Sequence, residues 1–255
     1  MKLAELCNYL DSELNLAAFS GDYSNNGIQV AGGDQEITKA VFAVDAALET
    51  IEYAEDAKAD FLFVHHGISW GSGFRRITGV DAKRIGLLFS SGITLYAAHL
   101  PLDAHPELGN NALLNKILGA KDLAPFCHVE GSFIGYTGTL SRRCGIEALV
   151  KKLKAALDDA ECNFYGDPDL KAGKIAVVSG GCSETVLTQA AEAGAELVVT
   201  GEFKHQLYHL ARELDLSVIA AGHYATETVG VKAVMEKINA KFGIEVEFAD
   251  CPTGL

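Results

Sequence analysis

Short apolar runs alternate with segments of helical periodicity along most of the chain. Residues 39–44 and 61–64 have the length and composition of buried strands, and residues 46–56 between them repeat apolar positions at helical spacing. The counterparts in the second half are residues 174–179, 183–192 and 197–200. Strands that alternate with helices of this length predict βαβ units and a mainly parallel sheet in each half.

A histidine followed four residues later by a carboxylate comes after the last predicted strand of each half. His99 and Asp103 follow the run at 95–98, and His223 and Glu227 follow the run at 218–221. Neutral imidazole and carboxylate are common ligands of divalent metals. The repeat predicts one site built from two related α/β lobes that arose by internal duplication. The alternative, that any two βαβ units look alike, explains the strands but not the matching ligands.

Two adjacent histidines, His65 and His66, follow the strand at 61–64, and the equivalent position of the second half holds Gly201 and Glu202. In parallel sheets, functional residues gather in loops at the carboxyl ends of strands. Adjacent side chains point to opposite sides of a regular strand, but in a loop they can diverge toward two separate metals.

The local geometry expected for the two motifs differs. Gly222 can close the turn before His223, and residues 227–239 have helical periodicity, so His223 and Glu227 share a face if the helix begins by His223. Pro101 and Pro106 interrupt the first motif, which predicts an irregular loop for His99 and Asp103.

The composition is that of a globular protein in a reducing compartment. The chain has 255 residues, of which 49% are hydrophobic, enough for one large domain or two lobes. No apolar run has the length of a membrane span, and residues 1–10 are typical of an amphipathic helix and not of a signal peptide. The six cysteines are scattered without a Cys-x-x-Cys motif, which predicts free thiols and a cytoplasmic location.

The formal charge of −13 argues against binding to duplex DNA, which requires a cationic surface. A small anionic substrate is still compatible with this charge if metal ions hold it. We expect residues 1–124 to form the first lobe and residues 125–255 the second. In this interpretation the segment from about 220 to 255 packs back toward the first lobe and completes the metal site.

Other polar residues leave several roles open. Glu202 is a candidate catalytic base, an acceptor for a ligand imidazole, or an acid at a helix start. His205 and His209 have the spacing of a rival zinc pair but lack a carboxylate partner, so a helix face that borders the site is favoured, with His209 in reach of substrate. Asn110 and Asn111 are predicted to cap the next helix.

These motifs resemble those of the Nif-three-like family, also called the GTP cyclohydrolase I type 2 family. The resemblance runs almost from end to end, and the block around His99 is its most specific part. The matching segments are residues 26–30 (Asn-Gly-Ile-Gln-Val), 64–67 (Val-His-His-Gly), 99–111, 200–202 (Thr-Gly-Glu) and 221–227. The length is that of the compact bacterial members.

The resemblance implies two α/β lobes with a dinuclear metal site in the cleft between them, and a ring-shaped homohexamer, a trimer of dimers. The family's ligands fall on His65, His66, Asp103, His223 and Glu227, with Glu227 as the bridging ligand and His99 near the site. Two divalent ions per subunit are expected. Mixed nitrogen and oxygen ligands suit zinc, manganese, iron or nickel and do not distinguish among them.

The activity favoured by these residues is metal-assisted hydrolysis of a small nucleotide-like substrate. If the family label applies, the electrophile is the purine imidazole carbon of GTP, and ring opening releases formate. Attack on phosphorus would make the protein a phosphoesterase instead. A third hypothesis is a non-enzymatic, metal-binding ring that serves as a scaffold.

Overall fold

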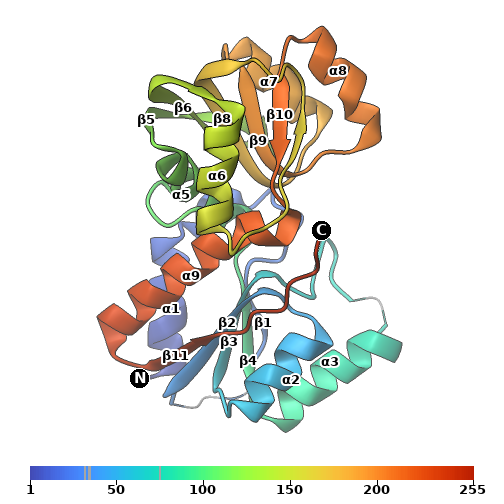
Figure 1. Cartoon of the computed structure of the whole chain (residues 1–255). Coiled ribbons are helices and arrows are strands. Elements are labelled where there is room, and N and C mark those ends of the chain that lie inside the picture. Colours follow the sequence, from blue (N-terminus) through green and yellow to red (C-terminus); the bar gives the residue numbers. More distant parts are fainter. Residues whose placement is uncertain (32, 34–35, 75) are drawn as a thin grey trace. The chain divides into compact units, whose positions relative to one another are not determined.

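A computed structural model describes residues 1–31, 33, 36–74 and 76–255 as a mixed α/β protein (Figure 1). The chain divides into two compact units. The first unit comprises Met1–Leu102 and Val231–Cys251, and the second comprises Asp103–Gly230 and Pro252–Leu255. The main boundary therefore falls after Leu102 and not at residue 124, because the helix and the strand that follow Asp103 belong to the second unit.

The first unit holds a sheet that has, among the described residues, the strand order β1-β4-β3-β2-β11. Its strands are β1 (Gly27–Val30), β2 (Lys39–Asp45), β3 (Phe61–His66), β4 (Thr94–Ala97) and β11 (Glu245–Phe248). Only β1 is antiparallel to its neighbour in this part of the chain. The helical elements are α1 (Leu3–Glu13), η1 (Leu16–Phe19), α2 (Leu48–Asp56), α3 (Gly79–Ser90) and α4 (Leu100–Asp103).

Both faces of this sheet are buried, as the continuous apolar runs predict for parallel strands. Alternate residues of β2, β3 and β4 pack against α2 and α3, and the central side chains on that face include Val41, Leu62 and Leu95. The opposite face carries an aromatic row in which the ring of Phe63 lies 5.4 Å from that of Phe42 and 5.8 Å from that of Tyr96. The core of the unit therefore holds the carboxyl ends of β3 and β4 in a fixed register.

The second unit holds a sheet with the order β5-β6-β8-β9-β10-β7 within the described chain. Its strands are β5 (Ala120–Val129), β6 (Ser132–Gly145), β7 (Asn163–Tyr165), β8 (Lys171–Gly181), β9 (Leu197–Glu202) and β10 (Ser217–Ala220). The central strands β8, β9 and β10 are parallel. The helical elements are α5 (Asn110–Leu118), α6 (Ile146–Ala156), α7 (Glu184–Glu192), η2 (His205–Leu207) and α8 (Tyr208–Glu213).

Two separate apolar cores cover the faces of this second sheet. Leu114 of α5 and Leu149 of α6 belong to one core, and Leu187 of α7 and Ala211 of α8 belong to the other. The last helix, α9 (His223–Phe242), begins in the second unit and ends in the first. In the first unit its final turns contact α1, where the ring of Phe242 meets that of Tyr9 edge to face at 5.1 Å.

The two sheets share one order of elements. In each, an antiparallel strand (β1 or β7) precedes three parallel strands connected by helices, and that antiparallel strand pairs with the last of the three (β4 or β10). This shared order is what an internal duplication would produce. The duplication itself stays a prediction.

Three local expectations were wrong. Residues 100–103 form the short helix α4 and not an irregular loop, because Pro101 lies in the first turn, where a missing N–H costs no hydrogen bond. Asn110 and Asn111 lie inside α5 after the cap residue Gly109, and their side chains bind elsewhere. His65 and His66 lie inside strand β3 and not in a loop after it.

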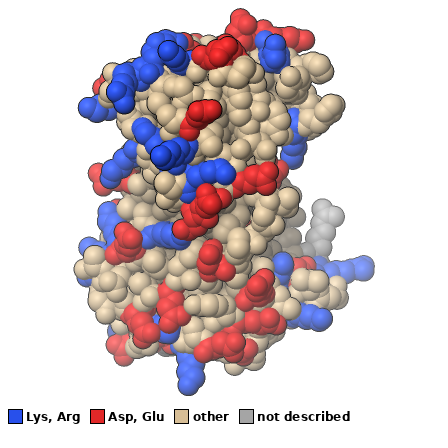
Figure 2. All heavy atoms as spheres, in the orientation of Figure 1, with Lys and Arg blue, Asp and Glu red and all other residues tan. Residues whose placement is uncertain are grey.

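The surface and composition agree with the other expectations as far as they are tested. No helix in the described chain combines the length and apolar character needed to cross a bilayer. None of the six cysteines forms a disulfide, which confirms that expectation. Acidic and basic side chains are interspersed on the face shown in Figure 2, and absence of duplex DNA binding remains a prediction from the net charge of −13.

Replacement of Asn111 by Ala should destabilise the second unit. The buried Asn111 amide accepts a hydrogen bond from the N–H of Ser179 at 2.6 Å and donates one to the carbonyl of Ile134 at 2.7 Å. Loss of both partners should lower the free energy of unfolding by about 2–4 kcal/mol, because each buried group left unpaired costs about 1–3 kcal/mol. Urea denaturation followed by circular dichroism measures this change.

The matched control is Gln206→Ala, at an exposed position of η2, which should change the free energy by less than about 0.5 kcal/mol. Equal midpoints for the two variants would contradict a structural role of Asn111.

Candidate metal centre

Three imidazoles of the first unit form one cluster at the carboxyl ends of β3 and β4. The ring of His65 lies 4.6 Å from that of His66 and 5.1 Å from that of His99, between centroids. One ring nitrogen of each histidine lies within 4.8 Å of the corresponding nitrogens of the other two. His65 is fully buried. The structure therefore brings His99 to the histidine pair.

In each ring of this cluster, Nδ1 lies within hydrogen-bonding distance of an oxygen atom. The Nδ1 atom of His65 lies 3.0 Å from the carbonyl of Ala98, and that of His66 lies 2.9 Å from Oδ1 of Asp45. The Nδ1 atom of His99 lies 3.0 Å from Oδ1 of Asp22. An acceptor at Nδ1 places the proton there and makes Nε2 the nitrogen that can bind a metal.

Asp22 is a site residue that the sequence analysis missed. Its carboxylate accepts hydrogen bonds from the N–H of Leu100 and from the amide of Asn26, as well as from His99. Burial raises the pKa of Asp22, but hydrogen bonds from His99, Asn26 and the N–H of Ser24 outweigh burial and lower it. The carboxylate therefore stays ionised beside His99. Its sequence signal was the Asp-x-x-x-Asn spacing that leads into the motif at residues 26–30.

Gln29 of that motif holds the loop that follows His66. Its Oε1 accepts from the N–H groups of Ile68 at 2.7 Å and Ser69 at 2.9 Å, and its Nε2 donates to the carbonyl of Asn25 at 2.8 Å. The same loop carries Trp70, whose indole N–H donates to the carbonyl of Gly67 at 2.9 Å. The Trp70 ring meets His99 edge to face with centroids 5.1 Å apart, so Gln29 indirectly fixes a wall of the cluster.

The second unit carries its own ligand group at the start of α9. The helix begins at His223, so the i, i+4 spacing brings Nε2 of His223 to 3.3 Å from Oε1 of Glu227, as the periodicity predicted. The Nδ1 atom of His223 lies 2.6 Å from Oε1 of Glu202, at the end of β9. Among the three roles left open for Glu202, this contact favours the acceptor for a ligand imidazole.

The two carboxylates favour positive charge on His223. The hydrogen bond with Glu227 is the main cause and outweighs burial, and Glu202 adds to it, so the pKa of His223 rises to about 9. Without a metal the ring holds a proton between Glu202 and Glu227 at neutral pH. Nε2 of His223 would hold a divalent cation only in place of that proton, because a metal ligand must be the neutral imidazole.

Glycine at the ends of β8 and β9 makes room for this group. Gly180 has φ of +61°, and a Cβ there would lie 2.3 Å from Oε1 of Glu227 and 3.1 Å from Nε2 of His223. A Cβ at Gly201 would lie 2.6 Å from the carbonyl of Gly180 and 2.7 Å from Cα of His223. These glycines therefore permit the close packing of α9 against the strand ends.

Asp103 lies in the second unit with the His223 group. The residue is buried, and its Oδ1 accepts hydrogen bonds from Nδ2 of Asn110 at 2.8 Å and from Oγ of Ser179 at 2.9 Å. Ser179 precedes Gly180, which contacts Glu227, so Asp103 and Glu227 both lie at the carboxyl end of β8. Asn110 also accepts the N–H of Gly230 at 2.8 Å and thereby connects α5 to α9.

His209 lies apart from these ligand groups. It is exposed on α8, and its ring meets that of Tyr208 edge to face at 5.4 Å. Within the described residues, the clusters of three metal-type ligands include neither His205 nor His209. A contact of His209 with substrate stays a prediction.

The donor chemistry of both units fits divalent metal. The first unit supplies imidazole nitrogens whose Nδ1 atoms have acceptors, and the second supplies His223 with the carboxylates of Glu227 and Asp103. Nitrogen and oxygen donors of this kind suit zinc, manganese, iron or nickel, and the ligand types do not select one of them.

Known proteins resemble this chain over its whole length. Residues 1–253 match the sequence profile of the family described as Duf34/NIF3 (NGG1p interacting factor 3). A Pyrococcus horikoshii protein named "GTP cyclohydrolase 1 type 2 homolog" is 45% identical, with 98% of each chain covered. The solved structure of "protein ybgI, unknown function" is 35% identical with a TM-score of 0.90 and 100% of each chain covered. Reduced HcgD from Methanocaldococcus jannaschii is 30% identical with a TM-score of 0.85 and 98% of each chain covered.

Replacement of Gly67 by Ala should disturb the histidine cluster through Gln29. A Cβ at residue 67 would lie 2.2–2.5 Å from the amide atoms of Gln29, so that side chain must move and lose its bonds to Ile68 and Ser69. We expect a loss of about 1–3 kcal/mol in the free energy of unfolding. Trp70 is the single tryptophan of the chain, so a change in its emission maximum should accompany this loss.

Gly86→Ala is the control, because Gly86 lies in α3 and an added Cβ meets no atom within 4 Å. Alanine there should stabilise the protein by up to about 1 kcal/mol through helix propensity. Unchanged tryptophan emission and stability in Gly67→Ala would disprove the role of Gln29.

Proposed function

The chain belongs to the Duf34/NIF3 family, and on this premise we propose that it is a dinuclear metal-dependent hydrolase of small, nucleotide-like anions. Its curated relatives are named as homologs of GTP cyclohydrolase 1 type 2, and that name suggests the substrate class. The observation that carries the proposal is the oxygen acceptor at Nδ1 of each of the three clustered histidines and of His223.

We assign five ligands to the two ions: His65, His66, Asp103, His223 and Glu227. Glu227 is the proposed bridging ligand, because its carboxylate is buried and already stabilises positive charge on His223. Carboxylate acceptors behind the imidazoles of metal sites fix ring orientation and raise ligand basicity. Asp45 and Glu202 have this position behind His66 and His223.

The chemistry divides between metal and protein. A bound divalent ion supplies Lewis acidity and makes water a nucleophile near neutral pH. His99 is outside the five-ligand set, and its Nδ1 is held by Asp22, so its Nε2 is available to hold or transfer a proton. Trp70 covers one side of His99 and limits the access of water to it. Glu202, through its bond to Nδ1 of His223, acts as a positioning residue in this proposal.

Replacement of Glu227 by Gln should reduce the metal content from two ions per subunit to one or none. The amide is isosteric but carries no charge to offset two cations, and the desolvated site then lacks its compensating carboxylate. Metal analysis of the purified protein after dialysis against trace-metal-free buffer measures the content. His205→Ala, at an exposed histidine outside the ligand groups, should retain both ions. Two tightly bound ions in the Glu227 variant would refute the bridging role.

Chelation should abolish turnover without dissolving the assembly. We expect a homohexameric ring whose contacts come from unit surfaces, so size-exclusion mass should survive removal of metal while hydrolysis of nucleoside triphosphates stops. Assays for formate and for inorganic phosphate distinguish a cyclohydrolase from a phosphoesterase. A ring that dissociates on chelation at neutral pH, with neither product formed by the metal-loaded protein, would support the scaffold reading against the hydrolase.

A further inference from the structure

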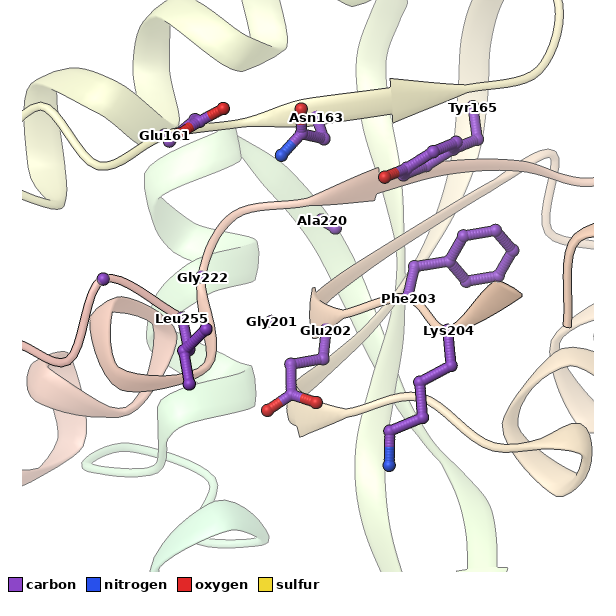
Figure 3. A pocket seen from close by; sticks show the side chains of 11 residues that line it. Glu161, Asn163, Tyr165, Gly201, Glu202, Phe203, Lys204, Ala220, Gly222 and Leu255 are labelled. Carbon is purple, nitrogen blue, oxygen red and sulfur yellow. The ribbon is translucent and has the colours of Figure 1, made fainter. Parts of the chain in front are cut away.

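A cavity of about 340 Å³ opens in the second unit, and Glu202 is one of the residues that line it (Figure 3). It lies over the end of β10, between β9 on one side and β7 on the other. Its volume is within the range of small-molecule sites, and the carboxyl ends of parallel strands are where ligands bind in open α/β sheets.

Small residues keep the floor of this cavity open. Gly201, Ala220 and Gly222 lie at its base and present little or no side chain. Asn163 and Tyr165 are two residues apart on β7 and therefore point to the same face of the sheet. Asn163 pairs directly with Ala220, so its amide lies next to the smallest side chain of the floor.

The walls combine aromatic surface with a cation. The rings of Tyr165 and Phe203 lie 5.1 Å apart at 45° and form an apolar wall. Lys204 is the single lysine or arginine among the described residues that line the cavity, and its side chain is exposed. Such a wall is suited to packing against a planar ring, and the ammonium of Lys204 is suited to pairing with an acid group on that ring.

Two glutamates also line the cavity and restrict the charge of its ligand. Glu161 is exposed at one end, and Glu202 uses Oε1 for its bond to His223. A carboxylate accepts hydrogen bonds at both oxygens, so Glu202 can still accept a further donor. These carboxylates repel an anionic ligand that has no hydrogen-bond donor. They favour an anionic ligand that also bears an amino group.

We propose that this cavity binds a small aromatic amine that carries an anionic group, with the ring on Phe203 and Tyr165, the anion on Lys204 and the amine on Glu202. This proposal extends the proposed hydrolase function, and only the later reaction of the ligand rests on that function. Binding of the ligand itself does not require metal. Because Glu202 also holds His223, a ligand in the cavity lies next to the proposed metal ligand.

Two probes distinguish the sources of this chemistry: 4-aminobenzoate, a free aromatic acid, and adenosine 5′-monophosphate, a nucleotide. Titration calorimetry and saturation-transfer NMR on the full chain, as purified and after chelation, measure binding. We expect at least one probe to bind with Kd below about 1 mM in both metal states. Lys204→Gln should weaken it about tenfold, because the neutral amide no longer pairs with the anionic group.

Two further variants test the aromatic wall of the cavity and provide a control. Phe203→Leu should also weaken binding while circular dichroism shows an unchanged fold, and Lys151→Gln, at an exposed lysine of α6, should bind like the wild type. Absence of binding by both probes, or affinity unchanged by Lys204→Gln, overturns the proposal. Binding that is lost on chelation and is unchanged by Lys204→Gln also overturns the proposal, because the probe then binds to the metal. Metal content measured on the same samples tests the hydrolase proposal separately.

Discussion

An imidazole presents one nitrogen to a metal in a defined direction only when its other nitrogen is held, and this constraint organises the candidate centre. Four histidines at strand ends meet it, with oxygen acceptors from Ala98, Asp45, Asp22 and Glu202. Two of these acceptors are the last residues of strands: Asp45 ends β2 beside β3, and Glu202 ends β9 beside β8. The register of the parallel strands therefore sets the positions of these side chains at the strand ends.

Buried polar residues also hold the proposed carboxylate ligands of the second unit in place. Asn110 and Ser179 both donate to Asp103, and Thr226 accepts the N–H of Gly180 beside Glu227. Buried polar groups of this kind stabilise a structure only when they are fully paired. The second unit therefore has its carboxylates and its helix α9 held by one connected set of hydrogen bonds, and the glycines at the strand ends provide the space in which that set closes.

Much of this arrangement could be predicted from sequence, since apolar runs report strands and i, i+4 spacing reports a helix face. His223 and Glu227 were predicted to meet for that reason, and they do. Asp22 and Gln29 could not be identified in this way, because their roles depend on partners 39 to 78 positions distant in the chain. The helix at 100–103 was missed because Pro101 was read as a breaker, although a helix accepts proline in its first turn.

The route of the chain has a consequence for synthesis. The first unit is interrupted after Leu102 by Asp103–Gly230, the main segment of the second unit, and resumes at Val231. Strand β2 pairs with β11, which leaves the ribosome about two hundred residues later, since Lys39 lies opposite Glu245. During translation the main segment of the second unit is complete while β2 still exposes an unpaired edge, and such edges promote pairing with other chains. Nascent chains of this protein therefore pass through a stage in which the later unit can fold first and the earlier unit waits for its last strand.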